Sequence, residues 1–78
     1  MAKTELFGTA SCPYTDEMRE WLEWKGCPFV EYDVERDAGA LTRMRAVTGG
    51  QSTVPVLLED GKVVEIGWRG QGCFVTTP

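Results

Sequence analysis

Apolar residues recur at helical spacing in the stretch that follows residue 12. The stripe sits at positions i, i+4, i+7 and i+8, and charged residues fill most of the surface between its members. Its members are Tyr14, Met18, Trp21 and Leu22. This pattern is typical of an amphipathic helix with one face on a core. Pro13 suits the first helical position, because the N–H that proline lacks would be unpaired there, and Gly26 marks the end. We therefore expect a helix over residues 13–25.

A second helix is expected after Asp37, whose side chain suits an N-cap. Apolar residues then recur on one face, and Gly49 and Gly50 end the pattern. The expected core positions of this helix are Leu41, Met44 and Val47.

Four short apolar or alternating segments predict β-strands. They are residues 4–8, 29–34, 54–58 and 63–66. Asp60 and Gly61 lie between the last two, and Asp-Gly between apolar runs strongly indicates a tight hairpin turn. Residues 67–73 are rich in glycine and are expected to be irregular.

The element order is therefore β-α-β-α-β-β. Two strands joined by a helix should lie parallel with a right-handed crossover, whereas the final pair forms an antiparallel hairpin. This order predicts an α/β protein with a four-stranded mixed sheet and two helices, which is the core of a thioredoxin-like fold. We expect one domain over residues 1–78, with an irregular tail from about residue 67.

Composition and charge narrow the possible functions. The 78 residues carry twelve acidic and eight basic side chains, with a net charge of −4 and no basic run. Nucleic acids and anionic membranes are therefore poor candidate partners. We find no apolar targeting segment and no stretch of membrane-spanning length, so we expect a cytoplasmic protein. We also expect it to be a monomer.

The cysteines are the candidate chemical groups. Three cysteines without C-x-x-C spacing do not suggest a disulfide framework, and the absence of histidine excludes Cys–His catalysis and most zinc sites. Cys12 lies where the first strand gives way to the first helix. Helix N-termini favour a thiolate, so Cys12 is the candidate nucleophile. Asp16 and Glu17 in the first helical turn oppose this effect.

Two motifs together resemble those of the glutaredoxin family. One is C-P-Y-T at residues 12–15, and the other is T-V-P at residues 53–55, some forty residues later. A hairpin then leads to a glycine-containing segment at Gly67, so the resemblance covers residues 4–67. It implies a thioredoxin-like fold whose usual final helix is missing. The chain also resembles a short bacterial glutaredoxin-like group whose members can carry selenocysteine at the position of Cys12.

The sequence departs from the family at three places. Thr15 replaces the second cysteine of the usual C-P-Y-C motif, and residues 67–71 replace the family's Gly-Gly-Cys-Asp-like segment. The basic residue that the family has shortly before the cysteine is also missing, because residues 9–11 are neutral. The resemblance therefore implies a monothiol-like member with altered glutathione contacts.

The resemblance assigns catalytic positions to Cys12, Thr15 and Pro55. Cys12 would attack a disulfide and form a mixed disulfide. Thr15 would either donate its hydroxyl to the Cys12 thiolate or satisfy an N–H of the first helical turn. Pro55 would be the family's cis-proline, with the cysteinyl part of glutathione docked on Val54; the alternative is a trans proline that begins a strand.

Other residues are candidates for holding glutathione. Tyr14 would either form one wall of the groove or belong to the core. Gln51, Thr53 and Arg69 are the polar candidates for a carboxylate of glutathione, although an arginine such as Arg69 is usually just solvated. Trp68 would either stack on a substrate or cover the hairpin end.

The two remaining cysteines have simpler interpretations. Cys73 would either swing back to Cys12 as a resolving thiol or be an unpaired tail cysteine, and the sequence favours the unpaired state. Cys27 is expected to pack as a small apolar residue.

These observations predict a glutathione-dependent thiol–disulfide oxidoreductase that acts through Cys12 by a monothiol route. Glutathione would be its co-substrate, and its partners would be protein or small-molecule disulfides. One alternative is a glutathione-ligated iron–sulfur carrier. Another is a glutathione-independent redoxin that a flavoprotein reductase reduces.

Overall fold

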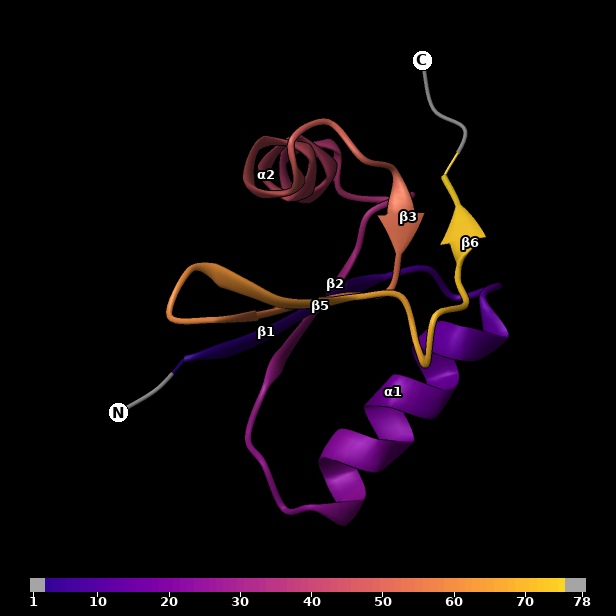
Figure 1. Cartoon of the computed structure of the whole chain (residues 1–78), viewed down its shortest axis with the longest axis vertical. Coiled ribbons are helices and arrows are strands. Elements are labelled where there is room, and N and C mark those ends of the chain that lie inside the picture. Colours follow the sequence, from indigo (N-terminus) through magenta and orange to yellow (C-terminus); the bar gives the residue numbers. More distant parts are fainter. Residues whose placement is uncertain (1–2, 76–78) are drawn as a thin grey trace.

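The computed structural model describes residues 3–75 as a sheet with one helix on each face (Figure 1). The elements are β1 (Thr4–Gly8), α1 (Pro13–Trp24), β2 (Val30–Asp33), α2 (Ala38–Thr48), β3 (Thr53–Val54), β4 (Val56–Glu59), β5 (Lys62–Ile66) and β6 (Cys73–Phe74). Helices α1 and α2 lie on opposite sides of the sheet, which Figure 1 shows edge-on.

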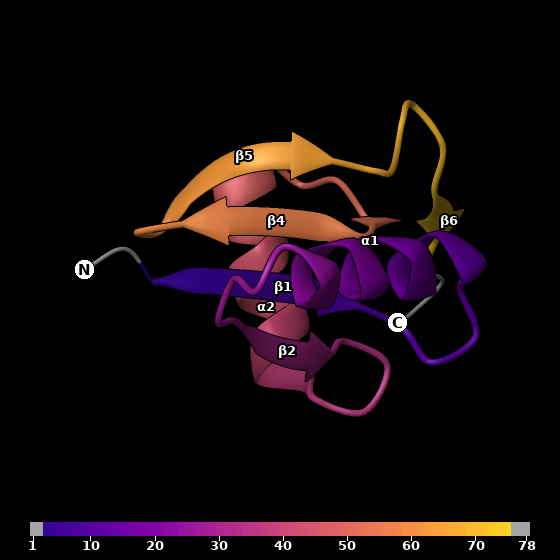
Figure 2. The ribbon, with the colours of Figure 1, turned by 90° about the horizontal axis from the view of Figure 1, so that it is seen from below.

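The main sheet has four strands in the order β2-β1-β4-β5 (Figure 2). Strand β1 pairs parallel with β2 and antiparallel with β4, and β4 pairs antiparallel with β5. Asp60 and Gly61 join β4 to β5 with φ of 53° and 80°, the positive values that a two-residue hairpin turn of type I′ requires. The mixed sheet, the two helices and the thioredoxin-like order predicted from the sequence are confirmed.

The expected third strand is interrupted at Pro55. Residues 53–54 form β3, which leaves the main sheet, and β4 begins only at Val56. Proline has no N–H to donate to a ladder, so it separates the two strands. Strand β3 pairs antiparallel with β6 in a second, two-stranded sheet. The tail after residue 67 is therefore not wholly irregular, because it supplies this sixth strand.

Both helices begin and end as their sequences predict. Pro13 is the first residue of α1, and Lys25 is its C-cap. The Asp37 side chain caps α2 by accepting a hydrogen bond from Ala40 N–H at 3.0 Å, and Gly49 ends α2 in the left-handed conformation. Val47 was expected on the buried face of α2, but it is 38% exposed.

The core has two apolar clusters, because side chains of each strand alternate between the two faces of the sheet. The smaller cluster lies under α1 and contains Leu6, Met18, Leu22 and Leu57. The larger cluster lies under α2 and extends to the active-site candidates: Phe7, Cys12, Val34, Ala40, Leu41, Met44, Val54, Val56, Leu58 and Val75. The sulfur of Cys12 is therefore held by the same core that anchors the tail.

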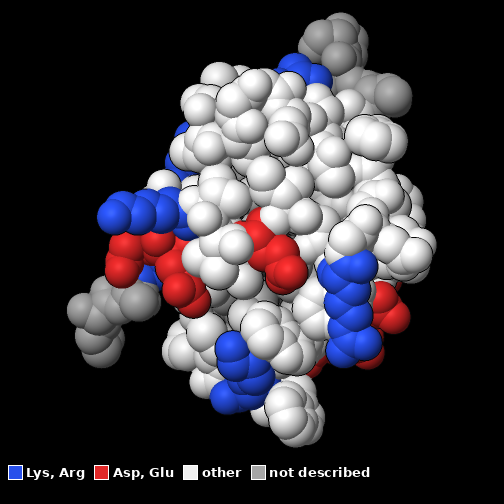
Figure 3. All heavy atoms as spheres, in the orientation of Figure 1, with Lys and Arg blue, Asp and Glu red and all other residues white. Residues whose placement is uncertain are grey.

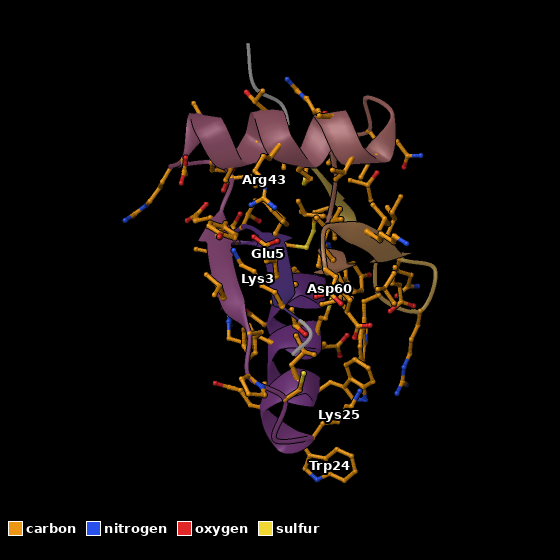
Figure 4. All side chains as sticks on the ribbon, turned by 90° about the vertical axis from the view of Figure 1, so that its left-hand side faces the viewer. Lys3, Glu5, Trp24, Lys25, Arg43 and Asp60 are labelled. Carbon is orange, nitrogen blue, oxygen red and sulfur yellow. A yellow bond between two sulfur atoms is a disulfide. The ribbon has the colours of Figure 1, made fainter. Side chains whose placement is uncertain are left out.

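One acidic side chain is buried in the middle of this structure. Glu5 of β1 is 1% exposed, and Arg43 of α2 donates hydrogen bonds to both of its carboxylate oxygens. Tyr32 donates a further hydrogen bond at 3.0 Å. Figure 4 shows Arg43 reaching from α2 to Glu5, so this pair ties the helix to the central strand. Within residues 3–75, no helix is long and apolar enough to cross a membrane.

Candidate active site

The candidate nucleophile is the N-cap residue of α1. Cys12 has extended backbone angles (φ −94°, ψ 115°), and Pro13 follows as the first helical residue. Its carbonyl accepts the first helical hydrogen bond from Asp16 N–H at 3.3 Å. Among the described residues its side chain makes no capping hydrogen bond, and its sulfur lies at the positive end of the helix.

Cys12 and Cys73 form a disulfide that joins the start of α1 to β6. Their Cα atoms are 6.0 Å apart, although 61 positions separate them in the sequence. The preference for an unpaired Cys73 is therefore wrong. The spacing of cysteines along the chain could not predict this bond, because the bond depends on the pairing of β6 with β3. Cys27 is the free cysteine, and it lies half-buried against the α1 cluster, in line with its expected packing role.

Backbone pairing between β3 and β6 holds Cys73 beside the predicted docking residue. Val54 pairs with Cys73 and Thr53 pairs with Phe74. Val75 N–H extends the ladder with a 2.9 Å hydrogen bond to the Ser52 carbonyl. The two strands lie side by side at one end of the main sheet (Figure 1). Cys73 therefore pairs with the backbone of Val54, where we expected the cysteinyl part of glutathione to dock.

The bond between Val54 and Pro55 is cis, as the resemblance implies. Pro55 is fully buried, and its carbonyl accepts a 2.6 Å hydrogen bond from Gly67 N–H. This contact anchors the start of the tail next to β3.

Thr15 does not contact the Cys12 sulfur through a hydrogen bond in this disulfide form. It is completely buried, and its hydroxyl oxygen accepts a 3.5 Å hydrogen bond from Thr9 N–H. This contact differs from the predicted bond to an N–H of the first helical turn, because the Thr9 amide belongs to the loop before α1. Thr15 therefore holds the loop that carries Cys12. The predicted donation to a Cys12 thiolate stays a prediction, since Cys12 is disulfide-bonded here.

The remaining candidates divide into two groups. Tyr14 is half-buried and packs against the cluster that contains the disulfide, so it belongs to the surroundings of the sulfur. Gln51 is exposed, and its carbonyl accepts a hydrogen bond from Thr48. Arg69 is also exposed, and its guanidinium lies 5.2 Å from the centre of the Trp68 ring. Gln51 and Arg69 are therefore outside the cluster around the disulfide, and Trp68 packs on the α1 side.

The surface over β3 and β6 is almost uncharged. No charged residue occurs between Arg45 and Glu59 or after Arg69. In the orientation of Figure 1, most of the face over these strands carries neither Lys and Arg nor Asp and Glu (Figure 3). A ligand at this edge would meet backbone groups and neutral side chains, among them the exposed Phe74, rather than a cluster of cations. Within residues 3–75 no group of three or more His, Cys, Asp or Glu side chains could hold a metal ion.

The model of the family described as glutaredoxin matches residues 4–64 of this chain. The chain belongs to the glutaredoxin family. Its membership and the Cys12–Cys73 pair support a function of the thiol oxidoreductase type.

Two curated glutaredoxins or glutaredoxin-like proteins are similar in sequence. A probable glutaredoxin of Synechocystis (slr1562) is 37% identical over 54 residues, which are 69% of this chain and 50% of that protein. An uncharacterized glutaredoxin-like 8.6 kDa protein of Clostridium pasteurianum, in a rubredoxin operon, is 32% identical over 60 residues, or 77% of this chain and 79% of that protein. The chain thus spans about half the length of the Synechocystis protein.

Solved structures of similar fold agree with the thioredoxin-like architecture. A point mutant of the thioredoxin-like protein BC3987 has a TM-score of 0.76 and 29% identity, covering 88% of this chain and 86% of its own. Glutaredoxin (grx-1) from Archaeoglobus fulgidus also has a TM-score of 0.76, at 22% identity, covering 88% of this chain and 78% of its own. At 22% identity, the comparison with the Archaeoglobus protein shows a shared fold and nothing further.

The sequence indicated Cys12 but favoured an unpaired Cys73 over one that bonds to Cys12. One usable signal precedes it, since Gly70 and Gly72 allow a sharp reversal and a close backbone approach. Together with the docking position expected at Val54, these glycines would have indicated that the tail returns to β3.

Proposed function

We propose that this glutaredoxin is a thiol–disulfide oxidoreductase in which Cys12 attacks the substrate and Cys73 resolves the intermediate. The observation that supports it is the disulfide between Cys12, at the N-terminus of α1, and Cys73 on the opposing strand. A thiolate at a helix start is a suitable nucleophile, and a second thiol within bonding distance is a suitable resolving group.

The reaction cycle consists of four thiol–disulfide exchanges, two that reduce the substrate and two that reduce the protein again. The Cys12 thiolate attacks one sulfur of a substrate disulfide, and the other sulfur leaves as a thiolate. The Cys73 thiolate then attacks the Cys12 sulfur, forms the observed disulfide and releases the second substrate thiolate. Two glutathione molecules would restore both thiols, and together they would be oxidised to glutathione disulfide.

Glutathione as the electron donor is part of this proposal. Val54 offers it a backbone edge, and half-buried Tyr14 and Thr53 flank that edge. Gln51 and Arg69 lie outside the cluster around the disulfide, but both are exposed, so they remain the candidates for its carboxylates. We place the activity in the cytoplasm, where glutathione keeps thiols reduced.

The monothiol route predicted from the sequence becomes the competing pathway. In that route a second glutathione, rather than Cys73, would attack the mixed disulfide at Cys12. The intramolecular disulfide favours the route through Cys73, because Cys73 lies in the same chain and needs no encounter with a second thiol.

A second candidate is a redoxin that a flavoprotein reductase reduces without glutathione. The same disulfide favours it, because a protein that stores two electrons in its own thiol pair needs no glutathione adduct during turnover.

Reduction of a glutathione mixed disulfide, coupled to glutathione reductase, tests the proposal. We expect activity in the wild type and in Cys27→Ser, the matched cysteine control, and none in Cys12→Ser. Activity that survives Cys12→Ser would overturn the assignment. Wild-type turnover with a flavoprotein reductase but not with glutathione would favour the second candidate.

Mass spectrometry after exposure of the reduced protein to one equivalent of oxidised glutathione separates the two routes. The wild type should carry an internal disulfide, whereas Cys73→Ser should accumulate one glutathione on Cys12. A stable glutathione adduct on wild-type Cys12, with Cys73 still free, would show that the monothiol route operates.

A further inference from the structure

The tail segment (residues 70–75) covers the nucleophile. Cys12 is 1% exposed, and Cys73 from this segment is bonded to it. A substrate sulfur that attaches to Cys12 must lie where the Cys73 sulfur now lies, since both would form the second half of a disulfide with the same atom. The backbone that carries that sulfur would then lie beside Val54, in the position that the Cys73 backbone occupies.

Several contacts hold the tail segment to β3 besides the disulfide. Val75 is 5% exposed and belongs to the same apolar cluster as Val54. Its N–H donates a 2.9 Å hydrogen bond to the carbonyl of Ser52. Burial of a valine and closure of this ladder both stabilise the docked segment. Docking therefore does not depend on the sulfur bond alone.

A tight turn directs the tail segment back toward β3. Trp68 and Gln71 exchange backbone hydrogen bonds of 2.6 and 2.9 Å across two residues, Arg69 and Gly70. Both central residues have positive φ, 51° and 81°, as in a type I′ turn. Residues 68–71 therefore reverse the chain direction by themselves, without a contribution from the Cys73 disulfide.

Gly72 permits the close approach. A Cβ atom at this position would lie 2.5 Å from the Val54 carbonyl oxygen and 2.8 Å from Cγ2 of Thr53. Its φ is outside the left-handed region, so space rather than backbone conformation requires glycine here. Any larger residue would push the tail segment away from β3.

We propose that the tail segment is a built-in competitor for the substrate edge of β3, which stays docked on Val54 when Cys12 and Cys73 are reduced. This inference rests on the proposed function of Cys12. Glutathione or an extended peptide disulfide must displace residues 70–75 before its sulfur reaches Cys12. The reactivity of Cys12 is then lowered by the fraction of molecules whose tail segment is docked.

Removal of the disulfide isolates this effect. In Cys73→Ser the tail segment keeps Gly72 and Val75 but cannot bond to Cys12. Reaction of Cys12 with oxidised glutathione, followed by mass spectrometry, should be about tenfold faster in Cys73→Ser/Gly72→Ala than in Cys73→Ser, which corresponds to about 1.4 kcal/mol of docking free energy. Cys73→Ser/Val75→Ala should show the same direction of change, and it covers the case in which the glycine variant folds poorly.

Gly39→Ala in the same background is the matched control. A Cβ at Gly39 would make one contact of 3.4 Å, with Asp37 Oδ1, so it should leave the rate of Cys12 unchanged. Hydrogen exchange should also show protection of the Val75 amide in Cys73→Ser and loss of that protection in Cys73→Ser/Gly72→Ala. Equal rates of Cys12 reaction in these two variants, or an unprotected Val75 amide in Cys73→Ser, would overturn the proposal that the tail segment competes with substrate. Failure of Cys12 to form an adduct in all variants would instead reject the proposed function itself.

Discussion

Arg43 donates hydrogen bonds of 2.7 and 2.9 Å to the two carboxylate oxygens of Glu5. The pair joins α2 to the strand at the centre of the sheet, and it holds the pKa of the Glu5 carboxyl at about 2 instead of 4.5. The hydrogen bonds from Arg43 are the main cause, because they stabilise the charged form of the carboxylate against the effect of its burial.

This pair predicts a specific sensitivity to acid. Since the pKa of Glu5 is lower in the folded protein than in the unfolded chain, its contribution to stability is complete above pH 4.5 and is lost as the pH falls toward 2. Arg43→Met should lower the free energy of unfolding at pH 7 by about 2 kcal/mol, less than for a fully buried pair because Arg43 is half-exposed. Urea unfolding at pH 7, 4 and 3 measures both effects.

Arg36→Met is the control for that experiment. Arg36 is 88% exposed and lies 3.9 Å from Asp33, so its loss should change the free energy of unfolding by less than about 0.5 kcal/mol. Equal destabilisation by the two substitutions would contradict the role assigned to Glu5 and Arg43.

The Cys12–Cys73 disulfide should stabilise the whole domain. It closes a loop that contains both helices and three strands of the main sheet, β2, β4 and β5, whereas β1 precedes Cys12. Full reduction should lower the free energy of unfolding by about 2–4 kcal/mol, because the unfolded chain gains freedom when the loop opens. Guanidinium unfolding with and without a reductant measures the difference. Cys73→Ser should not respond to the reductant, and an equal response would trace the effect to another group.

Gly8 is required beside Thr15. A Cβ added at Gly8 would overlap the methyl and hydroxyl groups of the Thr15 side chain. Gly8→Ala should therefore lower the free energy of unfolding by about 2 kcal/mol through overpacking. Thr15→Ala in the same chain should recover part of that loss, because it removes both atoms that clash most closely. Thermal unfolding of the four members of this double-mutant cycle measures the coupling, and purely additive effects would argue against a direct clash.

The tryptophans of α1 should differ in their contributions to stability. Trp24 is 82% exposed and points away from the body of the molecule (Figure 4). Trp21 is half-buried, with its ring 5.7 Å from that of Trp68 and the Lys25 ammonium 4.0 Å from its centre. Trp24→Gln should change the free energy of unfolding by less than about 0.5 kcal/mol, whereas Trp21→Gln should lower it by about 2 kcal/mol. Chemical denaturation of both variants would reveal a reversed order if Trp24 packed on the core.

Local signals in the sequence were enough to predict most of the fold. Pro13 and Gly49 mark helix ends through their own backbone restrictions, and Asp60 with Gly61 encodes its turn within two residues. Each of these features is decided by neighbours in the chain, so it can be read without knowledge of the tertiary contacts.

The contacts that the sequence did not reveal are those between distant segments. The bond of Cys73 to Cys12 depends on where β6 docks, and the burial of Glu5 depends on Arg43, 38 residues away. Thr15 likewise accepts a hydrogen bond from Thr9 N–H, an amide of the loop before α1 that the sequence did not connect to it. Composition and periodicity describe each segment alone, so they could not assign these partners.

Because the two sheets are separate, the β3–β6 ladder can open while the main sheet stays folded. The main sheet β2-β1-β4-β5 is sandwiched between α1 and α2, whereas the β3–β6 ladder is two residues long on each strand and lies at its end. Opening of β6 about the turn at Arg69 and Gly70 would break few contacts and leave the sandwich intact. The reduced protein should therefore open its active site through a local fluctuation that requires far less free energy than global unfolding. Substitutions in the tail segment would then change substrate access without changing the stability of the main sheet.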